Sequence, residues 1–338
     1  MIVKKTPVLK AFLNIDYVKK LSNFVGFDCG DHPVFYDIET TGLSRYSSFL
    51  YLIGALAQEN NCWFIYQWMA EKESEEQEVL CEFFDFMKPA TATFQFNGKT
   101  FDQPYLEERY KRYSLPSPFV HIPAMDLYQE LKPCRDLLKL NKMKLTDLEK
   151  FLGISDRVYC DGKDCIGMYQ SYSQNADSIL LETILGHNME DLFGLEKIFH
   201  MLGYPVLFNG GFVPKTASLE DEGFLIRFEL PASVPVPVSK KGEGFYFTCQ
   251  EQKGALMAEV KNGKAKQYYR NYKDYDYIPG EETAMPKALS RYMDKSLRRP
   301  AKPETCFTWF RCDEGFLKDS GKQSRYLNST LPCLLQLK

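Results

Sequence analysis

The spacing of apolar and polar residues predicts three β-strands near the start of the chain. An apolar run begins at Val34 and ends in a Thr-Thr-Gly turn at residues 40–42, which is typical of a buried strand. Tyr51–Gln58 and Cys62–Met69 have strand patterns on either side of the turn Glu59–Asn61. Together these segments predict a three-stranded meander.

Helical spacing of apolar residues follows the meander and alternates with further strands. Ser74 and Gln77 have the spacing of a capping box before a helix. The longest helical period begins after Asn175 or Asp177, either of which can cap it, and ends before Gly203. The other segments predicted here are a strand at Thr91–Phe96, a helix at Pro104–Tyr113, a strand at His121–Leu127, a helix at Lys144–Leu152 closed by Gly153, and a polar loop at Ser155–Ser173.

The pattern changes after Val206, where strands predominate. The turn Asn262–Gly263 predicts a hairpin, and a single helix is predicted at Pro286–Lys295. The prolines 231, 235 and 237 indicate a loop. The predicted strands are Phe224–Leu230, Gly244–Gln250, Ala255–Val260 and Ala265–Tyr272.

Composition indicates a globular chain without membrane segments. Hydrophobic residues make up 44% of the 338 residues and charged residues 26%. No stretch is apolar for long enough to cross a bilayer, and residues 1–20 lack the apolar core of a signal peptide, so we expect a cytoplasmic protein. The ten cysteines form no C-x-x-C pair, and the pairs Cys160/Cys165 and Cys306/Cys312 lack zinc-finger spacing, so we expect buried, reduced thiols and no structural zinc.

Two carboxylates interrupt the first strand. Because side chains alternate along a strand, Asp37 and Glu39 point to the same face. Two like charges this close in a half-buried strand are costly unless a positive charge lies between them, and a divalent cation would supply it. The alternative is an exposed edge strand with two solvated acids.

Three more candidate residues lie near the ends of later elements. Asp102 lies where a strand passes into a helix, and the alternative to a catalytic role is a helix N-cap. His187 and Asp191 are four residues apart on the long helix and therefore share a face. For an isolated helix, this pair could equally be a surface pair.

Three motifs, taken in order, resemble one nuclease superfamily. They are Asp37–Leu43, Asn97–Asp102 and His187–Asp191. Together they resemble the DEDD (DnaQ-like) 3′-5′ exonuclease superfamily with its ribonuclease H-like fold, and in particular the YprB-like domain of bacteria, over about residues 30–205. Three residues separate His187 from Asp191, which is the spacing of the superfamily's Tyr variant and the one expected of YprB-like members.

The resemblance implies a role for each matching residue. In the superfamily, the counterparts of the four acids hold two divalent ions, Mg²⁺ or Mn²⁺, and the counterpart of the histidine orients or deprotonates the attacking water. The turn at Thr41, Gly42 and Leu43 would approach the terminal nucleotide, and Asn97 and Phe101 would shape the same pocket. The implied catalytic and metal-binding residues of this chain are Asp37, Glu39, Asp102, Asp191 and His187.

The resemblance also implies the fold and the function. The expected fold is α/β, a ribonuclease H-like mixed sheet flanked by helices, with a second, smaller β-rich domain. The expected reaction is removal of nucleotides from the 3′ end of DNA or RNA, particularly of single strands, by a two-metal mechanism. The alternatives are a catalytically silent nucleic-acid-binding protein with this fold, and an endonuclease or RNA-specific exonuclease.

The domain organisation follows from these matches and from charge. We expect a lead-in at 1–30, a ribonuclease H-like domain at 31–205 and a β-rich domain at 206–338 as a candidate nucleic-acid-binding domain. From residue 206 onward, 21 Lys and Arg face 16 Asp and Glu, whereas residues 1–205 carry 21 and 29. The aromatic and basic residues of 268–277 could stack bases, or alternate tyrosines could form a strand's core face.

Overall fold

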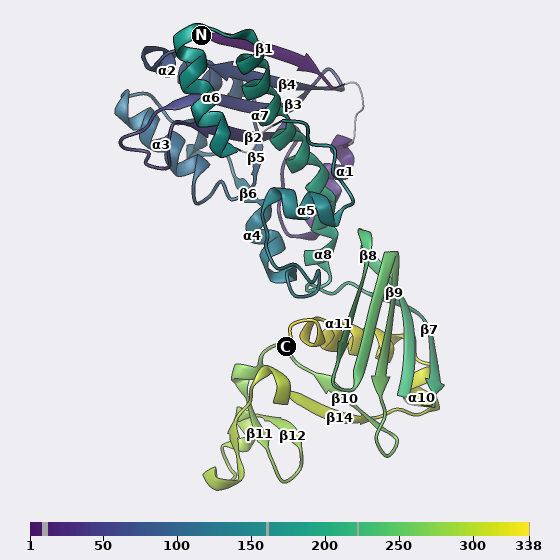
Figure 1. Ribbon diagram of the computed structural model, residues 1–338. Coiled ribbons are helices and arrows are strands. Elements are labelled where there is room, and N and C mark those ends of the chain that lie inside the picture. Colours follow the sequence, from purple (N-terminus) through teal and green to yellow (C-terminus); the bar gives the residue numbers. More distant parts are fainter. Residues whose placement is uncertain (9–12, 160–161, 222, 338) are drawn as a thin grey trace. The chain divides into compact units, whose positions relative to one another are not determined.

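The computed structural model describes residues 1–8, 13–159, 162–221 and 223–337, in two compact units (Figure 1). The first unit consists of Met1–Arg135 and Leu140–Leu202. The second consists of Asp136–Lys139 and Gly203–Lys338.

The first unit is built on a six-stranded sheet with the order β1-β4-β3-β2-β5-β6. The antiparallel part is β1-β4-β3-β2, whereas β5 and β6 continue it in parallel with β2. The predicted mixed sheet and meander are therefore confirmed. The strands are β1 (Ile2–Pro7), β2 (Pro33–Thr40), β3 (Leu50–Glu59), β4 (Cys62–Met69), β5 (Ala92–Gln95) and β6 (Ala124–Asp126).

Helices cover both faces of this sheet. The hydrophobic core on one face contains side chains of α2 and α3, and the core on the other contains side chains of α6 and α7. This layered arrangement agrees with the expected α/β fold. The helices of the unit are α1 (Ile15–Phe24), α2 (Glu76–Met87), α3 (Asp102–Arg112), α4 (Leu127–Leu131), α5 (Leu145–Phe151), α6 (Gly162–Asn175) and α7 (Ser178–Phe199).

Strand β2 is buried between the two helical layers. Val34, Tyr36 and Ile38 pack in the core with α2 and α3. Phe35, which lies between Val34 and Tyr36, points to the opposite face. It packs edge-on against Phe199 of α7, with ring centroids 5.7 Å apart. The odd-numbered positions of β2 therefore face α7.

The polar loop expected at Ser155–Ser173 is wrong over most of its length, because α6 occupies Gly162–Asn175. Cys165, Tyr169 and Tyr172 are buried and have helical spacing. Tyr169 stacks on Tyr51 of β3 with ring centroids 4.1 Å apart. Serine and glutamine residues between these positions hid the apolar stripe from the sequence pattern.

Other local expectations for the first unit also need correction. Ser74 does not cap α2, because Glu73–Glu75 form a 3₁₀ turn and the N-cap position belongs to Glu75. Residues 2–7 of the expected lead-in form edge strand β1, paired with β4.

Helix α7 begins after Asp177, which is one of the two residues predicted to cap it. The Asp177 side chain accepts a hydrogen bond from the Ile179 N–H.

The second unit contains three separate small sheets. Their orders are β7-β8-β9, β10-β14 and β12-β11-β13, each antiparallel. The β-rich character of this part is therefore confirmed. The strands are β7 (Val213–Glu220), β8 (Gly223–Gly242), β9 (Phe245–Glu259), β10 (Lys264–Tyr268), β11 (Tyr275–Ile278), β12 (Thr283–Pro286), β13 (Arg299–Pro300) and β14 (Phe307–Arg311).

Two predictions for the second unit are wrong because β8 and β9 are longer than the predicted strands. The prolines 231, 235 and 237 lie inside the long strand β8, not in a loop, and two predicted strands merge into β9. The β8–β9 register breaks between Glu229 and Val234 and again between Val234 and Val238. Proline lacks the N–H that a ladder needs, so β8 accommodates its prolines at these irregularities.

The Asn262–Gly263 turn is present, but the predicted hairpin is not. Both residues have positive φ, of 51° and 72°, as a tight turn requires. Strand β10 nevertheless pairs with β14, and β9 pairs with β8. Only an isolated bridge joins Lys261 to Lys264.

The helices of the second unit were largely missed by the sequence pattern. The helix expected at Pro286–Lys295 is reduced to Lys287–Ser290, and Ser320–Leu334 was not predicted. The tyrosines of 268–277 do not lie on one strand, and four of them pack around Ala284, Ala301 and Cys306. This packing favours the core interpretation of that stretch. The helices are α8 (Gly203–Val206), α9 (Lys287–Ser290), α10 (Glu314–Leu317) and α11 (Ser320–Leu334).

Nine cysteines among the described residues are free thiols, of which Cys62 and Cys81 are exposed, contrary to the expected burial. Cys160 lies outside the described residues. Within those same ranges, no helix combines the length and apolar character needed to cross a bilayer.

A buried ion pair joins α2, α3 and the start of β3. Arg109 and Glu76 are both fully buried, and the Arg109 Nε donates to Glu76 Oε1 at 2.6 Å. The same oxygen accepts the backbone N–H of Leu50 at 2.8 Å, and the second oxygen accepts the hydroxyl of Tyr113. The Glu76 carboxylate therefore connects α2, α3 and β3.

Replacement Glu76→Gln is expected to lower the free energy of unfolding by about 3–5 kcal/mol, because it leaves the Arg109 charge buried without its counter-ion. Urea denaturation of the full chain measures the change. Glu78→Gln, at an exposed position on the same helix, is the control and should change stability by less than about 0.5 kcal/mol. Equal stability of both variants would contradict a structural role for this pair.

Candidate active site

Asp37 and Glu39 lie on the face of β2 that is turned toward α7. Both are half-buried, as the alternation along β2 predicts. Asn188 of α7 donates its side-chain N–H to Asp37 Oδ2 at 3.1 Å. His187 Nε2 lies 3.5 Å from Glu39 Oε1. The helix therefore brings a polar partner to each of the two acids.

The close approach of α7 to the sheet depends on a glycine in β3. Gly54 is paired with Asp37, and a Cβ at Gly54 would overlap Oδ1 of Asn188. That same oxygen accepts the side-chain N–H of Gln67 at 3.0 Å. Gln67 thus fixes the orientation of the Asn188 amide so that its donor faces Asp37.

Asp191 lies one turn after His187 on α7. Its Oδ2 lies 3.3 Å from His187 Nε2. A nitrogen of His187 and carboxylate oxygens of Glu39 and Asp191 all lie within 4.8 Å of one another. The Nδ1 atom of His187 is buried and has no hydrogen-bond partner among the described residues. These residues form a compact group of potential metal ligands.

Asp102 is the first residue of α3 and is buried. The N-cap position belongs to Phe101, whose side chain forms no capping hydrogen bond, so the predicted N-cap alternative for Asp102 does not hold. Burial raises the pKa of the Asp102 carboxyl to about 7, with further upward contributions from the charges of Asp126 and Asp191. Backbone N–H groups of Asp102 and Ile38 act in the opposite direction.

The turn before Asp102 is held by a residue that sequence reasoning missed. Asp126, at the end of β6, accepts the backbone N–H groups of Asn97 and Lys99 at 2.8 and 3.1 Å. Asn97 is exposed and has a positive φ of 60°. Phe101 is half-buried and packs on Tyr105. The only signal in the sequence was the position of Asp126 at a predicted strand end.

The predicted substrate turn follows β2 directly. The backbone N–H of Thr41 donates to the Phe49 carbonyl at 2.9 Å, and Thr41 Oγ1 accepts the Phe49 N–H at 3.0 Å. The Gly42 carbonyl accepts the hydroxyl of Ser48. The Leu43 side chain is 88% exposed. An exposed apolar side chain on a closed turn beside the acids is available to contact another molecule.

Burial, with repulsion between the acids as the second contribution, dominates the electrostatics of the site. Burial raises the pKa of Asp37 and Glu39 well above the usual range, and the charges of Asp191 and Asp102 raise both further. A divalent cation would offset this cost by favouring the ionised carboxylates. Carboxylate oxygens are suitable ligands for Mg²⁺ or Mn²⁺, so the acids fit such an ion. Glu39, His187 and Asp191 form the compact ligand group, and Asp37 and Asp102 lie outside it.

An arginine at this site was also missed. Arg157 Nη1 lies 2.6 Å from Asp191 Oδ1. It precedes α6, inside the segment that was expected to be a polar loop. A single arginine without periodic neighbours gives no sequence signal, because its partners are 8 and 34 residues away.

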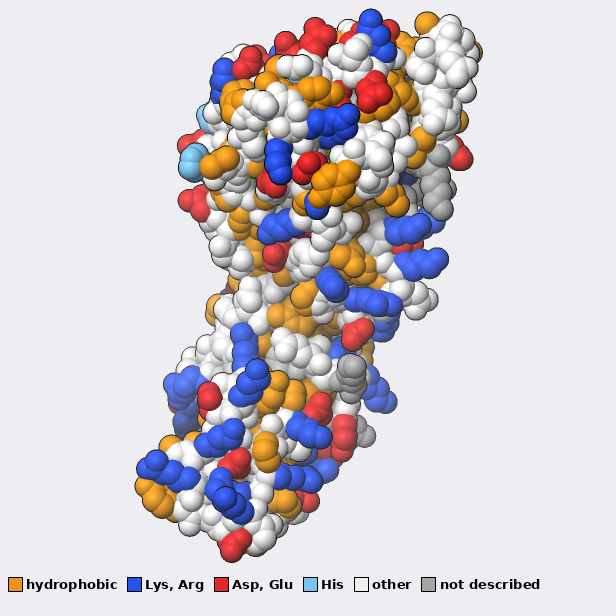
Figure 2. Space-filling model, turned by 90° about the vertical axis from the view of Figure 1, so that its left-hand side faces the viewer, with side chains coloured by type: hydrophobic (Ala, Val, Ile, Leu, Met, Phe, Trp, Pro, Cys, Tyr) orange, Lys and Arg blue, Asp and Glu red, His pale blue; other side chains and the backbone are white. Residues whose placement is uncertain are grey.

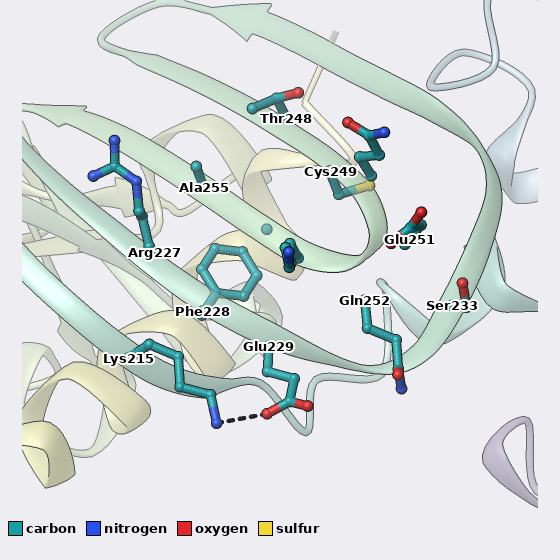
Figure 3. A pocket seen from close by; sticks show the side chains of 13 residues that line it. Lys215, Arg227, Phe228, Glu229, Ser233, Thr248, Cys249, Glu251, Gln252 and Ala255 are labelled. Atoms are coloured by element: carbon teal, nitrogen blue, oxygen red, sulfur yellow. Dashed lines mark ion pairs between the residues drawn. The ribbon is translucent and has the colours of Figure 1, made fainter.

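A separate cavity of about 890 Å³ lies in the second unit (Figure 3). Its lining comes from β7, β9 and β8, including the irregular part of β8. It contains the ion pair between Lys215 and Glu229 at 2.6 Å. Figure 3 shows the ring of Phe228 among the side chains that line this cavity. None of the candidate catalytic residues lines it.

Comparisons with known proteins place the first unit in a family. A search of curated proteins finds no match. Among solved structures, the chain is similar to the family B DNA polymerase from the hyperthermophilic archaeon Pyrobaculum calidifontis, at a TM-score of 0.41 and 18% identity over 54% of this chain and 26% of the polymerase chain. A similarity at this score carries no argument about the site. The family model of the RNase_H superfamily matches residues 34–203, which is half of the chain, and the chain therefore belongs to the RNase H superfamily.

Proposed function

We propose that this chain is a metal-dependent 3′-5′ exonuclease of the DEDD type, similar to the YprB-like members. The observation that carries the proposal is the group formed by Glu39, His187 and Asp191, whose ligand atoms lie within 4.8 Å of one another in a chain of the RNase H superfamily. Asp37 and Asp102 complete the proposed set, because the charge of Asp102, like that of Asp191, raises the pKa of both Asp37 and Glu39.

The proposed reaction is hydrolysis of a phosphodiester bond. Two bound Mg²⁺ or Mn²⁺ ions would supply charge stabilisation for the attacking and leaving oxygens. The residues Asp37, Glu39, Asp102 and Asp191 would hold these ions. His187 would accept a proton at Nε2, the ring nitrogen that faces Glu39 and Asp191.

The substrate-facing surface is proposed to include the exposed turn and the neighbouring loop. Leu43, with Thr41 and Gly42, would contact the terminal nucleotide, since this turn follows directly from the strand that carries the acids. Asn97 and Phe101 would form the wall next to Asp102. The nucleotide end, DNA or RNA, would thus lie between two loops that leave the same region of the sheet.

Replacement Asp37→Asn should lower the rate of hydrolysis by more than about 100-fold. Loss of residues that only hydrogen-bond to a metal ligand commonly costs about 10–100-fold, and loss of a proposed ligand itself should cost more. The measurement is a time course of 5′-labelled single-stranded DNA and RNA with Mn²⁺, Mg²⁺ or EDTA. Asp85→Asn, an exposed acid on α2, is the control and should retain full activity.

The product pattern separates the proposal from its rivals. A metal-dependent ladder that shortens from the 3′ end supports the exonuclease and shows the preferred sugar. Internal cuts would instead indicate an endonuclease. Binding of intact strands without hydrolysis, with either metal, would contradict catalysis and favour a silent nucleic-acid-binding protein.

Stability should depend on pH through the raised pKa of Asp102. Between pH values of about 4 and about 7, the folded protein keeps a proton that the unfolded chain has released. The free energy of unfolding without metal therefore falls as the pH rises through this window. Calorimetry in EDTA should show that the Tm of Asp102→Asn exceeds that of the wild type by a margin that grows from pH 5 to pH 8.

Added Mn²⁺ provides the complementary measurement. Ionised carboxylates bind the ion, so the increase in Tm that Mn²⁺ causes should be larger at pH 8 than at pH 5 in the wild type. In Asp102→Asn this increase should be smaller at pH 8. A Tm margin for Asp102→Asn that does not change with pH would contradict the role given to this carboxyl.

The second unit is proposed to bind nucleic acid through a basic surface. Residues 261–311 carry 12 Lys and Arg against 6 Asp and Glu. Figure 2 shows Lys and Arg side chains outnumbering acidic ones on the displayed face of this unit. Lys266 Nζ lies 4.3 Å from the ring centroid of Phe307 and 5.5 Å from that of Trp309. Phe307 is buried, whereas Trp309 is half-buried, so Lys266 with Trp309 would suit a phosphate and a stacked base.

The double replacement Lys266→Gln/Arg299→Gln should weaken single-strand binding, because it removes two of these cations. Its salt dependence, measured as log Kd against log salt, should become shallower by about 1.4. The full chain carrying Asp37→Asn is used so that the strand stays intact. Lys318→Gln, whose exposed lysine pairs with Glu314, is the control and should leave the slope unchanged. An unchanged slope in the double variant would exclude this surface.

A further inference from the structure

Arg157 is held by a buried carboxylate next to the candidate metal ligands. Its Nε and Nη2 donate to the two oxygens of Glu149 at 2.7 and 3.0 Å. The third nitrogen, Nη1, contacts Asp191 Oδ1 at 2.6 Å. Glu149 lies on α5 and is 4% exposed. One guanidinium thus spans two carboxylates with all three of its nitrogens.

The segment that carries Arg157 is fixed along α7 by several contacts. Glu190 accepts the backbone N–H groups of Val158 at 2.6 Å and Tyr159 at 3.3 Å. A Cβ at Gly186 would overlap the ring of Tyr159. Lys197 forms a further ion pair with Asp156 at 3.4 Å. The position of the guanidinium is therefore set by its own backbone as well as by Glu149.

A second glycine of α7 makes room for the buried carboxylate. A Cβ at Gly194 would overlap Oε1 of Glu149. Gly186 and Gly194 are two turns apart on the same helix, and each lies opposite a side chain of the Glu149–Tyr159 stretch. The absence of a side chain at these two positions, one before and one after Asp191, therefore leaves room for Tyr159 and Glu149 to pack against α7.

The charges explain what this arrangement does. Glu149 and Arg157 together are neutral, so they add no net positive charge beside Asp191. They add a directed hydrogen bond that occupies Oδ1 and leaves Oδ2 on the side of His187 and Glu39. Partners of this kind orient metal-ligating carboxylates, and their loss commonly weakens metal binding 10–100-fold.

We propose that Arg157, oriented by Glu149, is a positioning residue that fixes the Asp191 carboxylate for the divalent cation of this site. The proposal rests on the metal-dependent function proposed above. It assigns no contact between Arg157 and the substrate. It predicts that metal affinity depends on this pair even where the fold does not.

The test is a charge-neutral double replacement, Glu149→Gln/Arg157→Gln, in the full chain. Isothermal titration with Mn²⁺ alone, at fixed pH, should show a Kd increased by about 10–100-fold. The matched control is Asp156→Asn/Lys197→Gln, which removes the neighbouring ion pair that touches no candidate ligand. Its Kd should stay within about twofold of the wild type.

A purely structural role predicts a different outcome. In that case the Glu149→Gln/Arg157→Gln variant would show a lower Tm in EDTA but an unchanged Kd for Mn²⁺, which would overturn the proposal. Tighter binding would also overturn it, because it would make Arg157 a competitor of the ion. If this variant does not fold, Arg157→Lys, which retains the charge but not the three-nitrogen geometry, should still weaken binding by more than the control does.

Failure of the proposed function would be recognised separately. A wild-type chain that binds no Mn²⁺ at millimolar concentration would refute the metal site, and with it the role of Arg157. A wild-type chain that binds Mn²⁺, together with a double variant that binds it equally well, would refute the role of Arg157 alone.

Discussion

The strict alternation of side chains along β2 is the constraint on which the first unit depends. Tyr36 and Ile38 are fixed in one core, and Phe35 is fixed in the other. Asp37 and Glu39 are therefore directed toward α7 without any freedom to turn away. A shift of one residue in register would bury both acids under α2 and turn Tyr36 and Ile38 toward α7. Packing of the apolar residues of β2 in the two cores therefore fixes Asp37 and Glu39 next to the polar residues of α7.

The sequence was sufficient to predict the acids but not their supports. Strand alternation brought Asp37 and Glu39 to one face, and the four-residue spacing of His187 and Asp191 brought these to another. Such rules concern neighbours along one element. Arg157 and Asp126 act on residues from distant elements, and a single charged residue in a polar stretch has no period from which to infer a partner.

The second unit was harder to predict because its elements break local rules. Strand β8 contains prolines that ordinarily indicate a loop, and tertiary pairing with β7 on one side and β9 on the other outweighs this preference. The turn Asn262–Gly263 was read correctly, but a turn fixes only the local chain direction. The partner of β10 is β14, which lies far along the sequence and which no local pattern could identify.

The contact between Asn188 and Asp37 joins residues that are 151 positions apart in the sequence. The meander β2-β3-β4 consists of neighbouring segments and can form early in folding, because its loops are short. Helix α7 carries a further acid, and its packing against the acids of β2 is opposed by electrostatic repulsion. This long-range contact is therefore the charge-sensitive contact of the first unit.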